Sequence, residues 1–195
     1  MATVTAARPR STGVVYRAPK GTTLPTDAST TLSSAFKSLG YLSEDGFTNN
    51  YEISSEDIRE MGGNIVLTVQ TEVSDTFTFK LISAFEAEVQ KAVYGDSNVT
   101  GTVSGTNGMA VEVKGDEPAE SVWVLETIMR DNTLERIVIP DGKVSSIGEI
   151  AYKRNEAVGY DITVTALLDS TAGFNHKKYI KASSGTSGPS GTSGH

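Results

Sequence analysis

The sequence predicts a mainly β domain with one helix, and three observations support this. The 195 residues are 37% hydrophobic and 21% charged and include 19 glycines, a composition typical of a globular chain with many turns. Apolar and polar residues alternate in several short runs, as in half-buried strands. Only residues 83–95 have the apolar spacing of a helix. A chain of this length is expected to form one domain with a substantial core.

The two ends of the chain differ from its middle. We expect an extended basic arm at residues 1–19, a folded domain at residues 20–182 and a flexible tail at residues 183–195. The tail repeats Ser-Gly-Thr-Ser-Gly on both sides of Pro189, and small polar residues of this kind bury almost no surface. No apolar run is long enough for a transmembrane helix, so no membrane association is expected.

Charge is distributed unevenly along the chain. The net charge is −7, yet residues 1–20 carry four bases and no acid, whereas residues 21–75 carry nine acids and two bases. The four bases are Arg8, Arg10, Arg17 and Lys20. Three interpretations of this basic arm stay open: a solvated terminus, a segment that docks on an acidic neighbour, and a transit peptide.

Residues 65–81 show the cleanest alternation, and they predict a β-hairpin with its turn at Ser74 and Asp75. One side of this hairpin is apolar and is expected to face inward: Ile65, Leu67, Val69, Val73, Phe77, Phe79 and Leu81. The other side is mostly polar and consists of Thr68, Gln70, Glu72, Thr76, Thr78 and Lys80. What this polar side faces decides the function.

A helix is predicted over about residues 84–94. Ser83 and Glu86 have the spacing of a capping box, and Gly95 stands where a helix is expected to end. The apolar stripe of this helix consists of Phe85, Val89, Ala92 and Val93. A shorter helical turn is predicted at residues 54–61, directly before a Gly-Gly pair.

Residues 20–50 are predicted to be rich in turns, and most of the chain after the helix to form strands. The predicted strands are residues 98–103, 109–114, 122–130, 134–139, 143–153 and 160–167. Pro140, Asp141 and Gly142 predict a turn between two of these strands.

Residues 121–130 are apolar on both sides of the predicted strand. The two sets are Val122, Val124 and Ile128 on one side and Trp123, Leu125 and Met129 on the other. A strand that meets water normally has one polar face. This segment is therefore expected in the middle of a sandwich or against another molecule.

No catalytic, cofactor-binding or metal-binding residue is expected. The chain has no cysteine, and of its two histidines His176 is predicted to be an isolated surface residue while His195 lies in the tail. Acidic pairs could perform acid–base chemistry if one partner were buried, but all three lie among turn residues: Glu44 and Asp45, Glu56 and Asp57, Asp116 and Glu117. The lysines around Tyr179 form only a small cluster, so tight nucleic-acid binding is not expected.

Several short motifs, in their order and spacing over residues 20–180, give the chain a family resemblance. They are Leu24 and Pro25, GYLSEDG at 40–46, Gly62 and Gly63, EVSDTFTF at 72–79, VYG at 93–95, IPDGKV at 139–144, VGY at 158–160, and GFN at 173–175 before Tyr179. In these motifs the chain resembles the major tail, or tail tube, protein of long non-contractile-tailed (siphovirus-type) bacteriophages.

The resemblance implies an antiparallel β-sandwich or barrel with a flanking helix and no enzymatic activity. It implies a virion structural protein that forms rings, usually hexameric, stacked into the tail tube through which the genome is ejected. Expected partners are other copies of the chain and the tape measure, tail tip and tail terminator proteins. The expected location is the phage tail, after synthesis in the cytoplasm of the host bacterium.

Within that framework, two groups of residues are candidates for the functional surfaces. The expected lumen-facing side chains are Thr68, Gln70, Glu72, Thr76, Thr78 and Lys80. DNA is expected to pass without specific binding, because an acidic wall repels phosphates and releases no counterions. The candidates for contacts between subunits or between rings are Glu44 and Asp45 in the loop at 42–51, Arg8, Arg10, Arg17, Trp123, Leu125 and Met129.

Two other functions remain open at this point. One is a different ring-forming tail component, such as a tail terminator, or a relative of secretion-tube proteins. The other is a monomeric β-sandwich that binds a sugar, as in an adhesin, through Trp123 and Tyr160.

Overall fold

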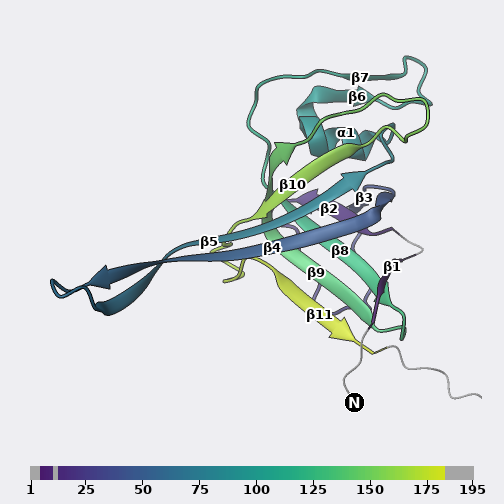
Figure 1. The fold of residues 1–195 in the computed structure, drawn as a ribbon. Helices are drawn as coiled ribbons and strands as arrows, with labels where there is room; N and C mark the ends of the chain where they lie inside the picture. Colours follow the sequence, from purple (N-terminus) through teal and green to yellow (C-terminus); the bar gives the residue numbers. More distant parts are fainter. Residues whose placement is uncertain (1–4, 11–12, 183–195) are drawn as a thin grey trace, which may run out of the picture.

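The computed structural model describes residues 5–10 and 13–182, and it confirms a mainly β, antiparallel fold with one α-helix (Figure 1). The strands are β1 (Ala7–Pro9), β2 (Val15–Pro19), β3 (Lys37–Ser38), β4 (Leu42–Arg59), β5 (Ile65–Leu81), β6 (Val99–Gly101), β7 (Met109–Val111), β8 (Ser121–Met129), β9 (Leu134–Ile147), β10 (Tyr160–Ala166) and β11 (Lys177–Lys181). The helix α1 spans Ala87–Tyr94, and a 3-10 turn follows at Asp96–Asn98. The predicted tail lies outside the described residues.

Nine strands form one sheet in the order β3-β2-β8-β9-β10-β5-β4, with β1 also paired to β8 and β11 to β9. Strand β9 belongs to both halves of this sheet, since its first half pairs with β8 and its second half with β10. The two halves face a common core, to which helix α1 contributes. That core includes Phe77, Phe79, Leu81, Val89, Trp123, Leu125, Ile137, Ile139, Ile162 and Val164. This is the sandwich that the resemblance implied.

The turn expected at Pro140, Asp141 and Gly142 is wrong, because β9 runs through these residues without a break. They form a bulge instead, since Trp123 pairs with Ile139 while Ser121 pairs with Gly142. A bulge accepts proline because the ladder hydrogen bond is already interrupted there. The glycine admits the Trp123 ring, whose Nε1 donates a hydrogen bond to the Gly142 carbonyl at 3.1 Å.

Strands β4 and β5 form one long hairpin, which contradicts three predictions. The turn at Ser74 and Asp75 and the loop at 42–51 lie inside these two strands, as do residues 54–59 of the predicted helical turn. The true turn lies at residues 60–64, where Gly63 has φ +89° and its N–H donates to the Glu60 carbonyl. Ser and Asp favour turns and helix caps locally, but here pairing with the partner strand overrides that preference.

The outer half of this hairpin, residues 51–74, projects away from the body (Figure 1); we call it the projecting arm. The expected inward orientation of the apolar side is confirmed for Phe77, Phe79 and Leu81, which are at most 3% exposed. It is wrong for the four aliphatic side chains on the arm, which are 39–54% exposed: Ile65, Leu67, Val69 and Val73. The alternating pattern therefore marks a true strand, but the apolar residues in its outer half have no core to face within one chain.

Helix α1 begins at Ala87, later than the capping box predicted. The Ser83 hydroxyl is occupied elsewhere, since it accepts a hydrogen bond from the Tyr41 N–H at 2.9 Å. Phe85 consequently lies before the helix and is 75% exposed, while the rest of the predicted stripe is buried. Gly95 ends the helix as expected, with φ +97°.

Both faces of β8 are covered by the chain itself. Trp123 and Leu125 lie in the common core. Val122 and Val124 lie in a second cluster with Tyr16, Phe36 and Val138, against which Leu24 and Leu32 pack. Residues 20–36, which we call the covering loop, therefore cover the second face, so no neighbouring subunit is needed there.

Substitution of Gly142 by alanine is expected to lower the free energy of unfolding by roughly 1–3 kcal/mol, the usual cost of overpacking. The added Cβ would lie 2.5 Å from Trp123 Cδ1 and 3.0 Å from Val164 Cγ1. Denaturant unfolding measures the change. The matched control is Gly115→Ala, where no atom lies within 4 Å of the new Cβ; equal midpoints for the two variants would contradict the packing argument.

Candidate functional site

The outward face of β4, β5, β10 and the end of β9 is rich in hydroxyl groups. Alternate residues of these strands point into the core, so their neighbours must point out. Thr78 lies opposite Thr48 on one side and Thr163 on the other, and the Thr78 and Thr163 hydroxyls are 3.1 Å apart. Thr165 donates to the Ser145 hydroxyl at 2.9 Å. We call this surface the hydroxyl face.

The two lysines at this face are both paired with carboxylates. Lys80 Nζ lies 3.1 Å from Glu156 Oε1, and Lys143 pairs with Glu117. The pKa of Glu156 is lowered by Lys153 and by Lys80, and the pKa of Glu117 is lowered by Lys143. These carboxylates stay charged until the pH falls through their lowered pKa values, so at neutral pH the lysine charges are compensated.

The six predicted lumen-facing residues divide into two groups. Thr76, Thr78 and Lys80 lie on the body at the hydroxyl face, whereas Thr68, Gln70 and Glu72 lie exposed on the projecting arm. A bulge separates Gln70 from Glu72, since these two residues pair with the adjacent Ser55 and Ser54. A bulge interrupts the alternation of side chains, so the six do not form one unbroken row.

The four strands behind the hydroxyl face have open edges on both sides. Within the described residues, the outer edge of β4 has no partner strand. On the other side, residues 143–147 of β9 pair with β10, while β8 accompanies β9 only as far as Gly142. An open edge presents unpaired N–H and C=O groups that can bind another strand.

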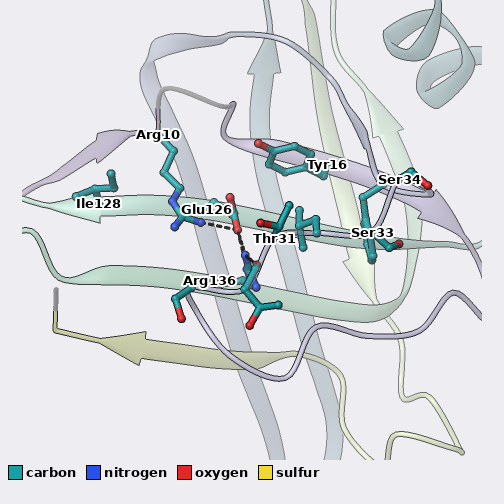
Figure 2. Close-up of a pocket in the computed structure, with 12 residues that line it drawn as sticks. Arg10, Tyr16, Thr31, Ser33, Ser34, Glu126, Ile128 and Arg136 are labelled. Carbon is teal, nitrogen blue, oxygen red and sulfur yellow. Dashed lines mark hydrogen bonds and ion pairs between the residues drawn. The ribbon is translucent and has the colours of Figure 1, made fainter. Parts of the chain in front are cut away.

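A buried ionic cluster holds the covering loop and the start of the chain on the body (Figure 2). Arg136 is 1% exposed, and its Nε donates to Glu126 Oε1 at 2.6 Å. Its two other nitrogens donate to the carbonyls of Asp27 and Thr30 at 2.6 and 2.7 Å. Arg10 reaches the same Glu126 oxygen at 2.7 Å. The cluster thus links β8, β9, the covering loop and the segment after β1.

Further polar contacts fix the covering loop. Lys20 Nζ lies 2.6 Å from Asp141 Oδ2 and 2.5 Å from Glu120 Oε2, and these carboxylates raise the lysine pKa. Hydrogen bonds from Thr30 and Ser29 hold the pKa of Asp27 well below its usual range. The loop is consequently ordered by its own polar groups as well as by the apolar cluster beneath it.

The structure gives all three arginines of the basic arm partners in the same chain. Arg8 donates to Asn132 Oδ1 at 2.5 Å, Arg10 binds Glu126, and Arg17 Nη2 lies 2.7 Å from Asp96 Oδ2. Residues 15–19 of the predicted arm form β2, inside the sheet.

The other predicted contact residues have different surroundings. Glu44 and Asp45 lie exposed near the start of β4. Trp123 and Leu125 are each 1% exposed, so neither is available to a neighbouring molecule, and Met129 is half-buried. Arg8, Arg10 and Glu44 come together as linings of one groove between β1 and β4.

The prediction that His176 is an isolated surface residue is wrong. Its Nδ1 lies 2.5 Å from Oδ2 of Asp75, a carboxylate that is 1% exposed and also accepts a hydrogen bond from Asn49 Nδ2 at 2.8 Å. The ring of His176 packs edge-on against Phe77. The signal for a buried Asp75 was its phase with Phe77 and Phe79, which the predicted turn concealed.

The described residues contain no group of three or more His, Cys, Asp or Glu side chains that could hold a metal ion. Among these residues, none of the helices has the length and apolar character needed to cross a membrane. A comparison with family models matches residues 3–184 to the family described as phage tail tube protein.

The chain belongs to the phage tail tube protein family. No match was found among the curated proteins. The family is structural rather than enzymatic, so this tail tube protein is a structural component of the phage tail and hence of the virion.

The variant Arg136→Met is expected to lower the free energy of unfolding of this tail tube protein by about 3–5 kcal/mol, the cost of breaking a buried ion pair from one side. The substitution removes the guanidinium that pairs with buried Glu126 and donates hydrogen bonds to two carbonyls of the covering loop. Thermal and denaturant unfolding measure the loss. Arg154→Met, at an exposed position, is the control and should change stability by less than about 0.5 kcal/mol; a similarly small loss for Arg136→Met would refute the anchoring role.

Proposed function

We propose that this tail tube protein assembles head-to-tail into rings, hexameric as the family resemblance implies, which stack into a tube for genome ejection. The observation that carries the proposal is the four-stranded layer β9-β10-β5-β4, with open edges on both sides and a hydroxyl face between them. Neighbouring strands in this layer are all antiparallel. The outer strands β9 and β4 therefore run in opposite directions, and β4 of one subunit meets β9 of the next as an antiparallel pair.

Edge pairing of this kind closes a barrel around a channel. A heterologous contact repeated around an axis gives a ring when the rotation closes. Six subunits with four strands each give roughly 24 strands, more than the 16 to 18 that already leave an aqueous channel in porins. Closure also removes the open edges, which would otherwise favour aggregation.

The chemistry of the hydroxyl face suits a channel for DNA. Phosphate binding by proteins depends on Lys and Arg side chains that displace counterions. On this face Lys80 and Lys143 are already paired with carboxylates, and the threonine and serine hydroxyls bond to one another. A channel surface of paired charges and hydroxyl groups is hydrated and offers few unpaired cations to bind DNA phosphates.

The proposal extends to partners and location. Other copies of the chain are the main partner, and the tape measure, tail tip and tail terminator proteins contact the inside and the ends of the tube. Synthesis takes place in the cytoplasm of the host bacterium, before incorporation into the phage tail.

Electron microscopy of the purified protein, with light scattering over a range of concentrations, tests the assembly. We expect hollow polymers with a regular repeat, because the open edges and the exposed apolar arm need partners. Single rings that never stack would favour a tail terminator or secretion-tube type of component. A particle that stays at one chain at every concentration would contradict the proposal and favour a monomeric binding module.

The double substitution Thr78→Lys and Thr163→Lys is expected to make assembled tubes retain short double-stranded DNA at low salt. The added charges would sit on the hydroxyl face, where Glu156 and Glu117 are already paired with Lys80 and Lys143. DNA binding should fall steeply as salt rises. Co-sedimentation of DNA with tubes measures retention. Thr106→Lys, in an exposed turn away from this face, is the control; equal retention by both variants would mean that the hydroxyl face does not line the channel.

A further inference from the structure

The projecting arm carries apolar side chains that the chain does not cover, on both faces of the ribbon. Ile53 lies opposite Val73 on one face and, past the bulge beside Ser54 and Ser55, Ile58 lies opposite Leu67 on the other; these four side chains are 39–55% exposed. Met61 at the tip is fully exposed. A two-stranded ribbon is marginally stable alone in water, and exposed apolar surface of this extent marks an interaction site.

A groove of about 640 Å³ lies on the body between β1 and the first residues of β4. Its apolar lining comes from Val14, Tyr41, Leu42 and Phe47, and its charged lining includes Arg8 and Arg10. Tyr41 is 76% exposed and Phe47 half-buried, so the groove offers an incomplete apolar surface. A volume of this size accommodates several aliphatic side chains.

The arm and the groove are complementary in charge. Residues 52–72 of the arm carry five acids and one base. The groove is lined by Arg8 and by Arg10, which also pairs with buried Glu126, and its single acid is Glu44. Complementary charge around apolar contacts selects the correct partner and its register.

The arm and the groove also lie at opposite ends of β4, which runs from the body out toward the tip (Figure 1). β4 begins at the groove with Leu42 and ends near the tip with Arg59, a length of about 60 Å at ~3.3 Å per residue. The tip of one subunit cannot fold back into its own groove while β4 stays extended. A contact between the tip of one copy and the groove of the next repeats along one direction, which is the geometry of an open polymer.

We infer that the tip of the projecting arm of one subunit docks in the groove between β1 and β4 of a subunit in the adjacent ring. This inference rests on the proposed function and names the surface that receives the arm. The apolar residues of the tip cover Tyr41 and Phe47, and the acids beside them meet Arg8 at the rim. Growth of the tube then depends on a specific joint at each subunit.

Cysteine cross-linking tests the joint directly, because the natural chain has no cysteine. Tubes of the double variant Met61→Cys with Tyr41→Cys, treated with a short bis-maleimide, are expected to give a ladder of covalent oligomers on a denaturing gel. The control pairs Met61→Cys with Val113→Cys, another exposed apolar position, and should give no ladder. Each single variant should give dimers at most.

A charge exchange supplies a second readout. Arg8→Glu and Glu60→Arg should each raise the protein concentration needed for tube growth by about fivefold, and the double variant should restore growth. Normal tubes without a ladder, or a double variant as impaired as the two singles combined, would overturn the docking inference and leave the proposed function intact. Failure of the unmodified protein to form tubes would overturn the proposed function itself.

Discussion

The fold depends on one strand that serves two halves of a sheet. β9 pairs with β8 over its first part and with β10 over its second, and the change of partner occurs where Gly142 accommodates the ring of Trp123. A side chain at this position would collide with the indole and with Val164. Because both halves of the sheet meet at this contact, the common core and the open edge at residues 143–147 both follow from it.

The second constraint is the buried charge at Glu126 and Arg136. A buried carboxylate is costly unless it is paired and hydrogen-bonded. Here its partner also binds two loop carbonyls, so satisfying the charge holds the covering loop over Val122 and Val124. The chain thereby covers both faces of β8 by itself, whereas the aliphatic side chains of the projecting arm stay exposed.

Much of the fold could be predicted from alternation and spacing, including the mainly β class, the helix around Val89 and Val93, and the polar character of Thr76 and Thr78. The errors share one physical cause. Pro140 to Gly142, Ser74 with Asp75, and Ser54 with Asp57 have strong local turn or cap chemistry, and in each case pairing with a distant strand overrides it. A single sequence contains the local signal but not the identity of the partner strand.

The same limit applies to the candidate site. The sequence indicated a polar surface next to an apolar one, yet it could not show that Ile65 and Leu67 would leave the body while Phe77 and Phe79 stayed inside. Nor could it bring Glu126 next to Arg136, or Asp75 next to His176, because these pairs depend on the sheet register and on a distant segment.

The contact between Asp75 and His176 has a mechanical consequence. Asp75 lies where the projecting arm leaves the body, and His176 directly precedes β11, which is itself paired to β9. A sideways force on the arm therefore passes into the central strand by two routes, through β10 and through β11. The base of the projecting arm is therefore connected to the sheet on two sides. Strain that begins at the tip is shared across the whole sheet rather than concentrated at one bend.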